Sequence, residues 1–73
     1  MTTPAEIARS LTDAQRRAVI IAEPCRNMVL VRRNRPITNA LMHVGITRSQ
    51  SVLWDQLTPL GLAVRQILQE QRK

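Results

Sequence analysis

The sequence is nearly without aromatic residues, because Trp54 is the only one and neither Phe nor Tyr occurs. Its hydrophobic fraction of 44% is therefore almost entirely aliphatic. An aliphatic core in a chain of 73 residues stabilises a fold by only a few kcal/mol. We predict a single domain over residues 1–73, and its small core favours a homodimer. With one aromatic available, stacking on single-stranded nucleic acid is disfavoured, so an RNA-binding role ranks low.

Residues that carry out chemistry are also scarce. Cys25 is the only cysteine, which excludes a disulfide scaffold and fits a reducing cytoplasm. One cysteine and one histidine, His43, cannot supply the roughly four ligands of a zinc site. The only glycines, Gly45 and Gly61, are too far apart for a phosphate-binding loop. We therefore expect no enzyme activity, no metal and no cofactor.

Long apolar runs are absent as well. The longest uninterrupted run, Ala18 to Ala22, is far shorter than the roughly 20 residues that span a membrane. The amino terminus is polar and lacks the apolar segment of a signal peptide. We expect a cytoplasmic protein with no membrane partner.

Acidic residues are missing from the middle of the chain. Between Pro24 and Trp54 there are five arginines and no Asp or Glu, although the whole chain has five acids and a net charge of +6. Arginine suits forked contacts to phosphate and to guanine. A basic segment of this kind indicates a polyanionic partner, most simply nucleic acid, and the alternative is a charge pattern kept for solubility.

Three segments carry helix-start signals. Thr3-Pro4-Ala5-Glu6 predicts a short helix over about 4–10, so residues 1–10 form either a short helix or an N-terminal arm. Thr12-Asp13-Ala14-Gln15 predicts another helix over about 13–22. Thr58-Pro59 begins a C-terminal helix whose apolar stripe packs in the core, pairs with its copy in a dimer, or does both.

Strand signals are weaker. Residues 25–27 are expected to form a loop, and the apolar run 28–31 a strand. Residues 46–57 are expected to form a hairpin with its tip near 49–51.

A basic loop at residues 32–35 precedes a predicted helix over about 36–44. Ile37 and Leu41 lie on one apolar stripe with Ala40 and Val44, and Gly45 follows at the position of a left-handed cap. The polar residues between them should face away from the stripe, as a surface that reads DNA bases requires. The candidate base contacts are Thr38, Asn39, Met42 and His43, and the candidate phosphate contacts are Arg32, Arg33, Arg35 and Arg48. The alternative is a surface helix beside a solvated basic loop.

Three phrases resemble winged-helix regulators of the MarR and PadR types. Leu57-Thr58-Pro59-Leu60-Gly61 resembles the end of their wing, and Ala40-Leu41-Met42-His43-Val44-Gly45-Ile46 resembles the exit from their recognition helix. Leu11-Thr12-Asp13-Ala14-Gln15-Arg16-Arg17 resembles their first helix. The resemblance touches roughly residues 11–68 and implies a winged-helix-like core over 11–71. A full winged helix has two helices between its first strand and its wing, whereas only one fits in that interval here. Such reduced forms are expected from phage or mobile-element genes.

The predicted fold is therefore mainly α with a small β-hairpin or three-strand sheet, as a variant of the winged helix-turn-helix. The favoured function is a small, sequence-specific regulator of transcription that binds double-stranded DNA in a bacterial cytoplasm. Its C-terminal helix is the candidate surface for a homodimer. The alternative is a phage-type inhibitor or adaptor whose basic face binds a larger protein.

Overall fold

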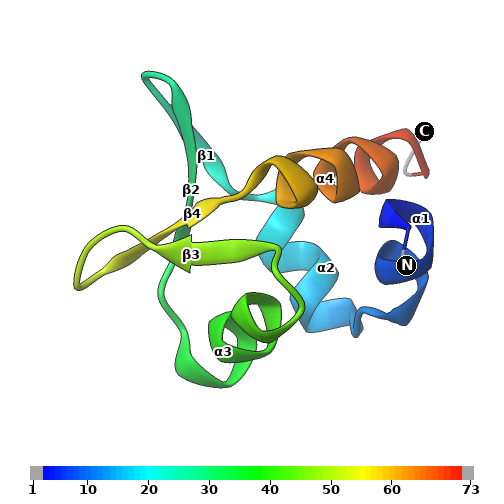
Figure 1. The fold of residues 1–73 in the computed structure, drawn as a ribbon, viewed down its shortest axis with the longest axis horizontal. Helices are drawn as coiled ribbons and strands as arrows, with labels where there is room; N and C mark the ends of the chain where they lie inside the picture. Colours follow the sequence, from blue (N-terminus) through cyan, green and yellow to red (C-terminus); the bar gives the residue numbers. More distant parts are fainter. Residues whose placement is uncertain (1–2, 72–73) are drawn as a thin grey trace.

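The computed structural model describes residues 3–71 and forms a small mixed fold of helices and one antiparallel sheet (Figure 1). Its helices are α1 (Pro4–Ser10), α2 (Asp13–Ile20), α3 (Arg35–His43) and α4 (Pro59–Gln71). Its strands are β1 (Glu23–Cys25), β2 (Met28–Arg32), β3 (Thr47–Ser49) and β4 (Trp54–Leu57). All four predicted helices are confirmed, with α2 ending two residues before the expected boundary. No helix within residues 3–71 is both long enough and apolar enough to cross a membrane.

The first two helices begin at the predicted capping boxes. Thr3 Oγ1 accepts a hydrogen bond from the Glu6 N–H at 3.2 Å, and the Glu6 carboxylate accepts from the Thr3 N–H at 3.3 Å. Thr12 and Gln15 repeat the arrangement at 3.2 and 3.0 Å. Each cap satisfies helix N–H groups that would otherwise lack a partner, and is worth about 1 kcal/mol.

The sheet has the order β1-β2-β4-β3, with every neighbouring pair antiparallel. The predicted hairpin is confirmed as β3–β4, whereas the loop predicted at 25–27 is confirmed only at residues 26–27, because Cys25 is the last residue of β1. Glu23–Cys25 pairs with β2, and Arg26 reverses the chain at a φ of 57°. No Gly or Asp marks this turn, and Pro24 is tolerated because β1 lies at the edge of the sheet. The sheet therefore has four strands rather than three.

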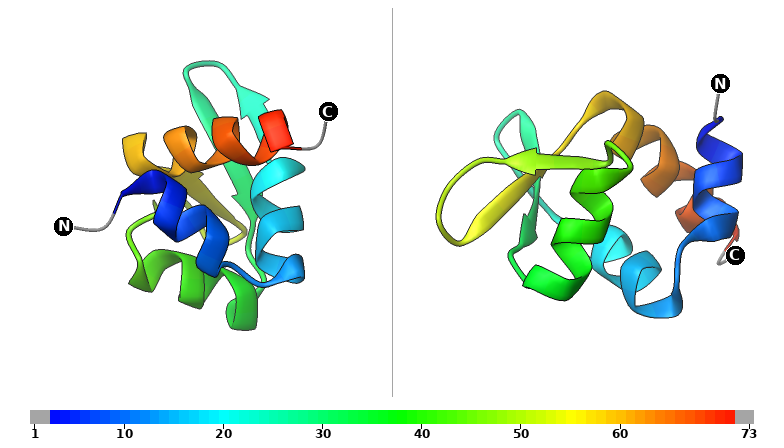
Figure 2. Two further views of the ribbon diagram at one scale, coloured as in Figure 1. Left: turned by 90° about the vertical axis from the view of Figure 1, so that its right-hand side faces the viewer. Right: turned by 60° about the horizontal axis from the view of Figure 1, so that its bottom comes forward.

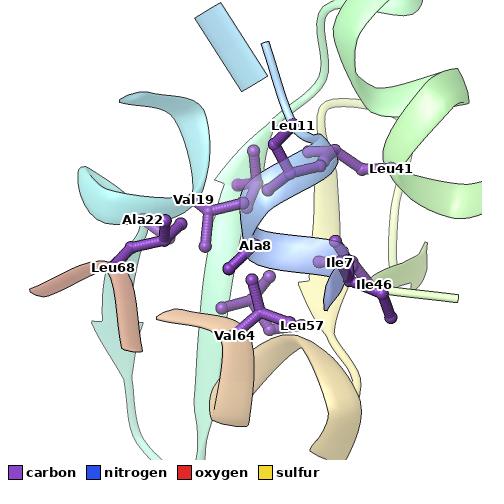
Figure 3. Close-up of a cluster of buried hydrophobic side chains, with 11 residues drawn as sticks. Ile7, Ala8, Leu11, Val19, Ala22, Leu41, Ile46, Leu57, Val64 and Leu68 are labelled. Carbon is purple, nitrogen blue, oxygen red and sulfur yellow. The ribbon is translucent and has the colours of Figure 1, made fainter. Parts of the chain in front are cut away.

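The core lies between the helices and one face of the sheet (Figure 3). Val31 and Leu57 contribute from the sheet, and Val19 and Val64 from α2 and α4, all at most 3% exposed. α1 packs along α4 and buries Ile7, so it is part of the core, which begins before residue 11. Figure 2 shows α1 and α4 side by side.

The apolar stripe of α4 is used within the protomer. Val64 is fully buried and Leu68 is 2% exposed, while Ile67 packs against the same core. Among the described large apolar residues of α4, only Leu62 is exposed, at 44%. The stripe on which a dimer through this helix was predicted is thus already covered by the chain's own residues.

The C-terminal end of α3 is closed by Gly45 and Ile46. Gly45 has a φ of 84°, and the N–H groups of Gly45 and Ile46 donate to Met42 O at 3.0 Å and Leu41 O at 2.9 Å. These bonds form a Schellman cap, as the glycine predicted. The cap fixes the direction in which β3 leaves the helix.

Thr58 connects that exit to α4. Its hydroxyl accepts from the Gly61 N–H at 3.1 Å, and its N–H donates to Ile46 O at 2.8 Å. The hydroxyl also lies within hydrogen-bonding distance of the Gly45 carbonyl. A Cβ on Gly61 would stand 2.2 Å from Ile46 O, so only glycine allows this approach. The Leu-Thr-Pro-x-Gly phrase therefore encodes the junction between β4, α4 and the end of α3.

Candidate functional site

α3 is held by one buried side and leaves the other side to solvent. Leu41 is fully buried and Ile37 is half-buried, as the apolar stripe predicted. Val44 departs from that prediction, because it follows the last helical residue as the C-cap and is 41% exposed.

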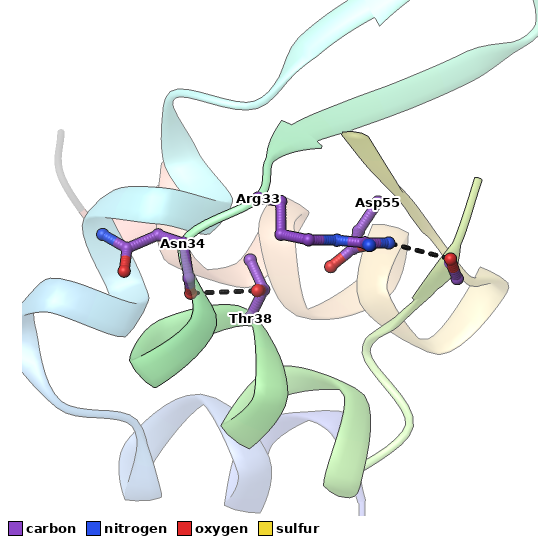
Figure 4. A network of polar contacts seen from close by, with 5 residues as sticks. Arg33, Asn34, Thr38 and Asp55 are labelled. Atoms are coloured by element: carbon purple, nitrogen blue, oxygen red, sulfur yellow. Dashed lines mark hydrogen bonds and ion pairs between the residues drawn. The ribbon is translucent and has the colours of Figure 1, made fainter. Parts of the chain in front are cut away.

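Thr38 was predicted to face solvent, and this is wrong because its side chain is 1% exposed. It lies three residues before Leu41 and so shares the buried side of α3. Its hydroxyl donates to the Asn34 carbonyl at 2.9 Å (Figure 4). That bond satisfies the buried hydroxyl and removes the cost of burying it. Thr38 is therefore part of the packing of α3 rather than of its surface.

The remaining polar residues of α3 lie where they were expected. Asn39, Met42 and His43 are exposed, and Met42 is 40% exposed. They occupy the second half of the helix, which ends at His43. An amide, a thioether and an imidazole thus form one solvent-facing surface, which we call the α3 face.

Three of the four candidate phosphate contacts, Arg32, Arg35 and Arg48, are exposed. Arg32 ends β2 and Arg35 begins α3. Arg48 lies on β3, where its guanidinium donates to Gln56 Oε1 at 3.4 Å. Within the described residues, none of the three forms an ion pair. The positive charge of these three arginines is therefore uncompensated among the described residues.

Arg33 is the exception, because its guanidinium is directed at a buried carboxylate. Its Nε and Nη2 donate to Asp55 Oδ1 at 3.2 and 2.7 Å, and Nη2 also donates to Ser49 Oγ at 2.8 Å. Asp55 is fully buried, while the Arg33 side chain is 30% exposed. Arg33 was predicted to contact phosphate, but its guanidinium is already engaged within the protein by Asp55 and Ser49. We call this group the Arg33 clamp.

The clamp connects the loop before α3 to the β3–β4 hairpin. Besides the side-chain bonds, the Arg33 N–H donates to Leu53 O at 2.8 Å. Asp55 and Ser49 are directly opposite each other in the β3–β4 register. Arg33 thus adds to the β2–β4 pairing and the Gly45 cap in holding the hairpin relative to α3. Sequence reasoning missed this pair, although Asp55 is the first acid after the basic segment.

The residues considered for chemistry are dispersed. Cys25 is exposed on the edge strand β1, and His43 is exposed at the end of α3. Among residues 3–71, no group of three or more His, Cys, Asp or Glu side chains is placed to hold a metal ion.

Comparison with known proteins adds no relative. The chain matches no protein-family model, and neither a curated protein sequence nor a solved structure is significantly similar to it.

Proposed function

We propose that this protein is a small regulator that binds double-stranded DNA, built on a reduced winged helix. The order β2, α3, β3, β4, α4 supports the proposal, because β3–β4 takes the place of a wing and α3 that of a recognition helix. The single observation that carries it is the α3 face, which is exposed, polar and flanked by unpaired arginines. The one acid nearby, Asp55, is buried against Arg33.

In this proposal the α3 face contacts base edges in the major groove. The groove is about 12 Å wide and admits one helix. Asn39 pairs with adenine through its amide, and His43 offers a ring nitrogen to a base or phosphate. Met42 supplies an apolar contact of the kind that a thymine methyl accepts.

The arginines bind phosphates on either side of the helix. Arg32 and Arg35 serve the strand near the start of α3, and Arg48 serves the strand crossed by the wing. Thr38 and Arg33 have no part in these contacts, because both are engaged inside the protein. Their role is to hold α3 and the wing in position, which preorganises the surface. Such a regulator acts in a bacterial cytoplasm.

A titration of duplex DNA at two salt concentrations tests the proposal. We expect binding to weaken as salt rises, since each neutralised phosphate contributes a slope of about −0.9 in log K against log salt. Random duplex and the DNA upstream of the protein's own coding sequence are compared in parallel. Tighter binding to the upstream DNA is expected. Absence of binding even at low salt would contradict the proposal.

Variants separate base contacts from phosphate contacts. Asn39→Ala should relax sequence preference, with a loss of about 1–3 kcal/mol on the preferred site only. Arg35→Ala and Arg48→Ala should weaken binding to all sequences and each lower the salt slope by about one. Arg9→Ala is the matched control, because Arg9 is exposed on α1, away from α3. It should change the slope by far less.

One feature favours a protein partner as the second candidate function. Val52 and Leu53 at the tip of the β3–β4 hairpin are 82% and 62% exposed, and exposed apolar pairs are typical of protein contacts. In this alternative the protein is an inhibitor or adaptor that binds a larger protein through its basic face. Tight binding to a purified partner, with no affinity for DNA at low salt, would favour this alternative.

A further inference from the structure

A groove of about 750 Å³ lies between α2 and the sheet. Ile21, just after α2, lines it together with Leu30 of β2, Trp54 of β4 and Ile37 of α3. α2 contacts both β2 and α3 (Figure 2). The groove therefore has lining residues from each of these three elements. We call it the α2–β2 groove. It is separate from the α3 face, whose residues do not line it.

Two large apolar side chains of the lining, those of Ile21 and Trp54, are exposed or half-buried rather than packed in the core. Ile21 is 66% exposed, although burying an isoleucine side chain fully is worth about 1.5–3 kcal/mol. Trp54 is half-buried, and the register places it on the sheet face opposite to the buried Asp55 and Leu57. Tryptophan is among the residues most enriched at the energetic centres of protein interfaces. The groove therefore offers an anchor for an apolar side chain.

The rim of the groove is positively charged. Arg17 on α2 and Arg32 on β2 are exposed lining residues, and neither forms an ion pair within residues 3–71. Arg33 also lines the groove but is neutralised by Asp55. Glu23 is the one acid in the lining. An occupant that complements this groove carries an apolar side chain with carboxylates on both sides of it.

We propose that the α2–β2 groove is a docking site for an acidic amphipathic peptide segment of a partner protein. One large apolar side chain of the segment packs between Ile21 and Trp54, and its carboxylates bind Arg17 and Arg32. Arg32 is shared with the proposed DNA contacts, whereas Arg17 and Ile21 lie outside the α3 face and its flanking arginines. The peptide proposal therefore does not depend on DNA binding.

The other occupants fit less well. A phosphate backbone complements the arginines but has no apolar side chain to cover Ile21 and Leu30. A second copy of this chain would have to present carboxylates, yet its most exposed apolar pair, Val52 and Leu53, stands in the segment without acids. A contact through that pair would bring positive charge against positive charge.

The intrinsic fluorescence of Trp54 provides a test at the site itself, since the chain has no other Trp and no Tyr. The probe is a synthetic Trp-free and Tyr-free helical peptide of about 12 residues, or roughly three turns, with Leu at i, i+3, i+4 and i+7 and Glu or Asp elsewhere. Titration of the full chain should give a saturable change in Trp54 emission. The same peptide with Ser in place of Leu should bind at least about tenfold more weakly.

Two variants and two matched controls locate the binding. Arg17→Glu and Ile21→Ser should each raise the Kd about tenfold or more, and both residues are exposed, so the fold should persist. Arg9→Glu is the control for charge, because Arg9 and Arg17 are both in the last turn of their helices. Leu62→Ser is the control for an exposed apolar residue, because Leu62 is exposed on α4 and does not line the groove. Neither control should change the Kd by more than about twofold.

Several results would overturn the proposal. They are an unchanged Trp54 emission at peptide saturation, equal binding of the Ser-substituted peptide, and equal losses in the control variants. A change in emission that depends on protein concentration alone would assign the groove to a second copy. A response to duplex DNA that Arg17→Glu abolishes would assign it to nucleic acid. Absence of DNA binding at the α3 face leaves the peptide result unaffected, so the two proposals fail separately.

Discussion

Removal of Arg33 should destabilise this protein far more than removal of its neighbour Arg32. Arg33→Ala leaves the fully buried Asp55 carboxylate without its ionic partner at 2.7 Å. Breaking a buried ion pair from one side costs about 3–5 kcal/mol, because an uncompensated charge remains in the interior. The Arg33 side chain is 30% exposed and can be replaced in part by water, so we expect the lower end, about 3 kcal/mol. That is most of the stability of a domain of this size.

The assay is urea denaturation followed by circular dichroism, with the free energy of unfolding extrapolated to water. Arg32→Ala is the matched control, since Arg32 is exposed and forms no ion pair within the described residues. Its cost should stay within about 0.5 kcal/mol.

A double-mutant cycle isolates the pair from other effects of truncation. In the Asp55→Ala background no buried carboxylate remains, and Arg33→Ala should then cost about 1 kcal/mol or less. The coupling energy should therefore reach about 2 kcal/mol. Equal costs for Arg33→Ala and Arg32→Ala, or a coupling below about 0.5 kcal/mol, would refute the reasoning and show that water screens the pair as it screens a surface ion pair.

Further predictions concern the backbone and the caps, each measured by the same denaturation. Gly61→Ala places a Cβ 2.2 Å from Ile46 O and should lower the free energy of unfolding by about 3 kcal/mol. Gly45→Ala meets nothing closer than 3.7 Å and should lower it by about 1 kcal/mol because of its φ of 84°. Equal costs for the two substitutions would contradict the close approach at Gly61. Arg26→Gly should stabilise the chain by up to about 1 kcal/mol by relieving a φ of 57°, and a loss of stability would contradict the turn geometry. Thr12→Ala should cost about 1 kcal/mol, and an unchanged midpoint would show that the cap contributes nothing.

Helix starts were predictable because their signals are local. Thr3 and Thr12 each form a capping box with a partner three residues ahead, so nothing distant is needed to form the bonds. Gly45 likewise predicted the end of α3, because glycine readily adopts the positive φ that a helix C-terminal cap requires. The turn at residues 26–27 falls within the predicted loop, but β1 was missed because its residues Glu23 and Pro24 are types that strands disfavour.

The site was predictable only as far as helix periodicity reaches. Asn39, Met42 and His43 follow from the position of Leu41 on the buried side of α3. Periodicity also places Thr38 on the buried side, three residues before Leu41. It was assigned to the surface with the other hydrogen-bonding residues, although its hydroxyl is satisfied by the carbonyl four residues back.

Arg33 lies among similar arginines in the sequence, and only a residue far along the chain distinguishes it. Asp55, 22 positions later, pairs with the Arg33 guanidinium, which would otherwise be a surface charge. No periodicity or composition conveys a pairing over that separation.

The central claim, that DNA binds the α3 face and its flanking arginines, is tested most directly by amide chemical-shift mapping of the full chain during a titration with duplex DNA. The account predicts that the largest shifts fall on Asn39, Met42 and His43, with further shifts at Arg35 and Arg48 and none beyond noise at Arg9. Shifts centred on the α2–β2 groove, or no shifts at low salt, would contradict it.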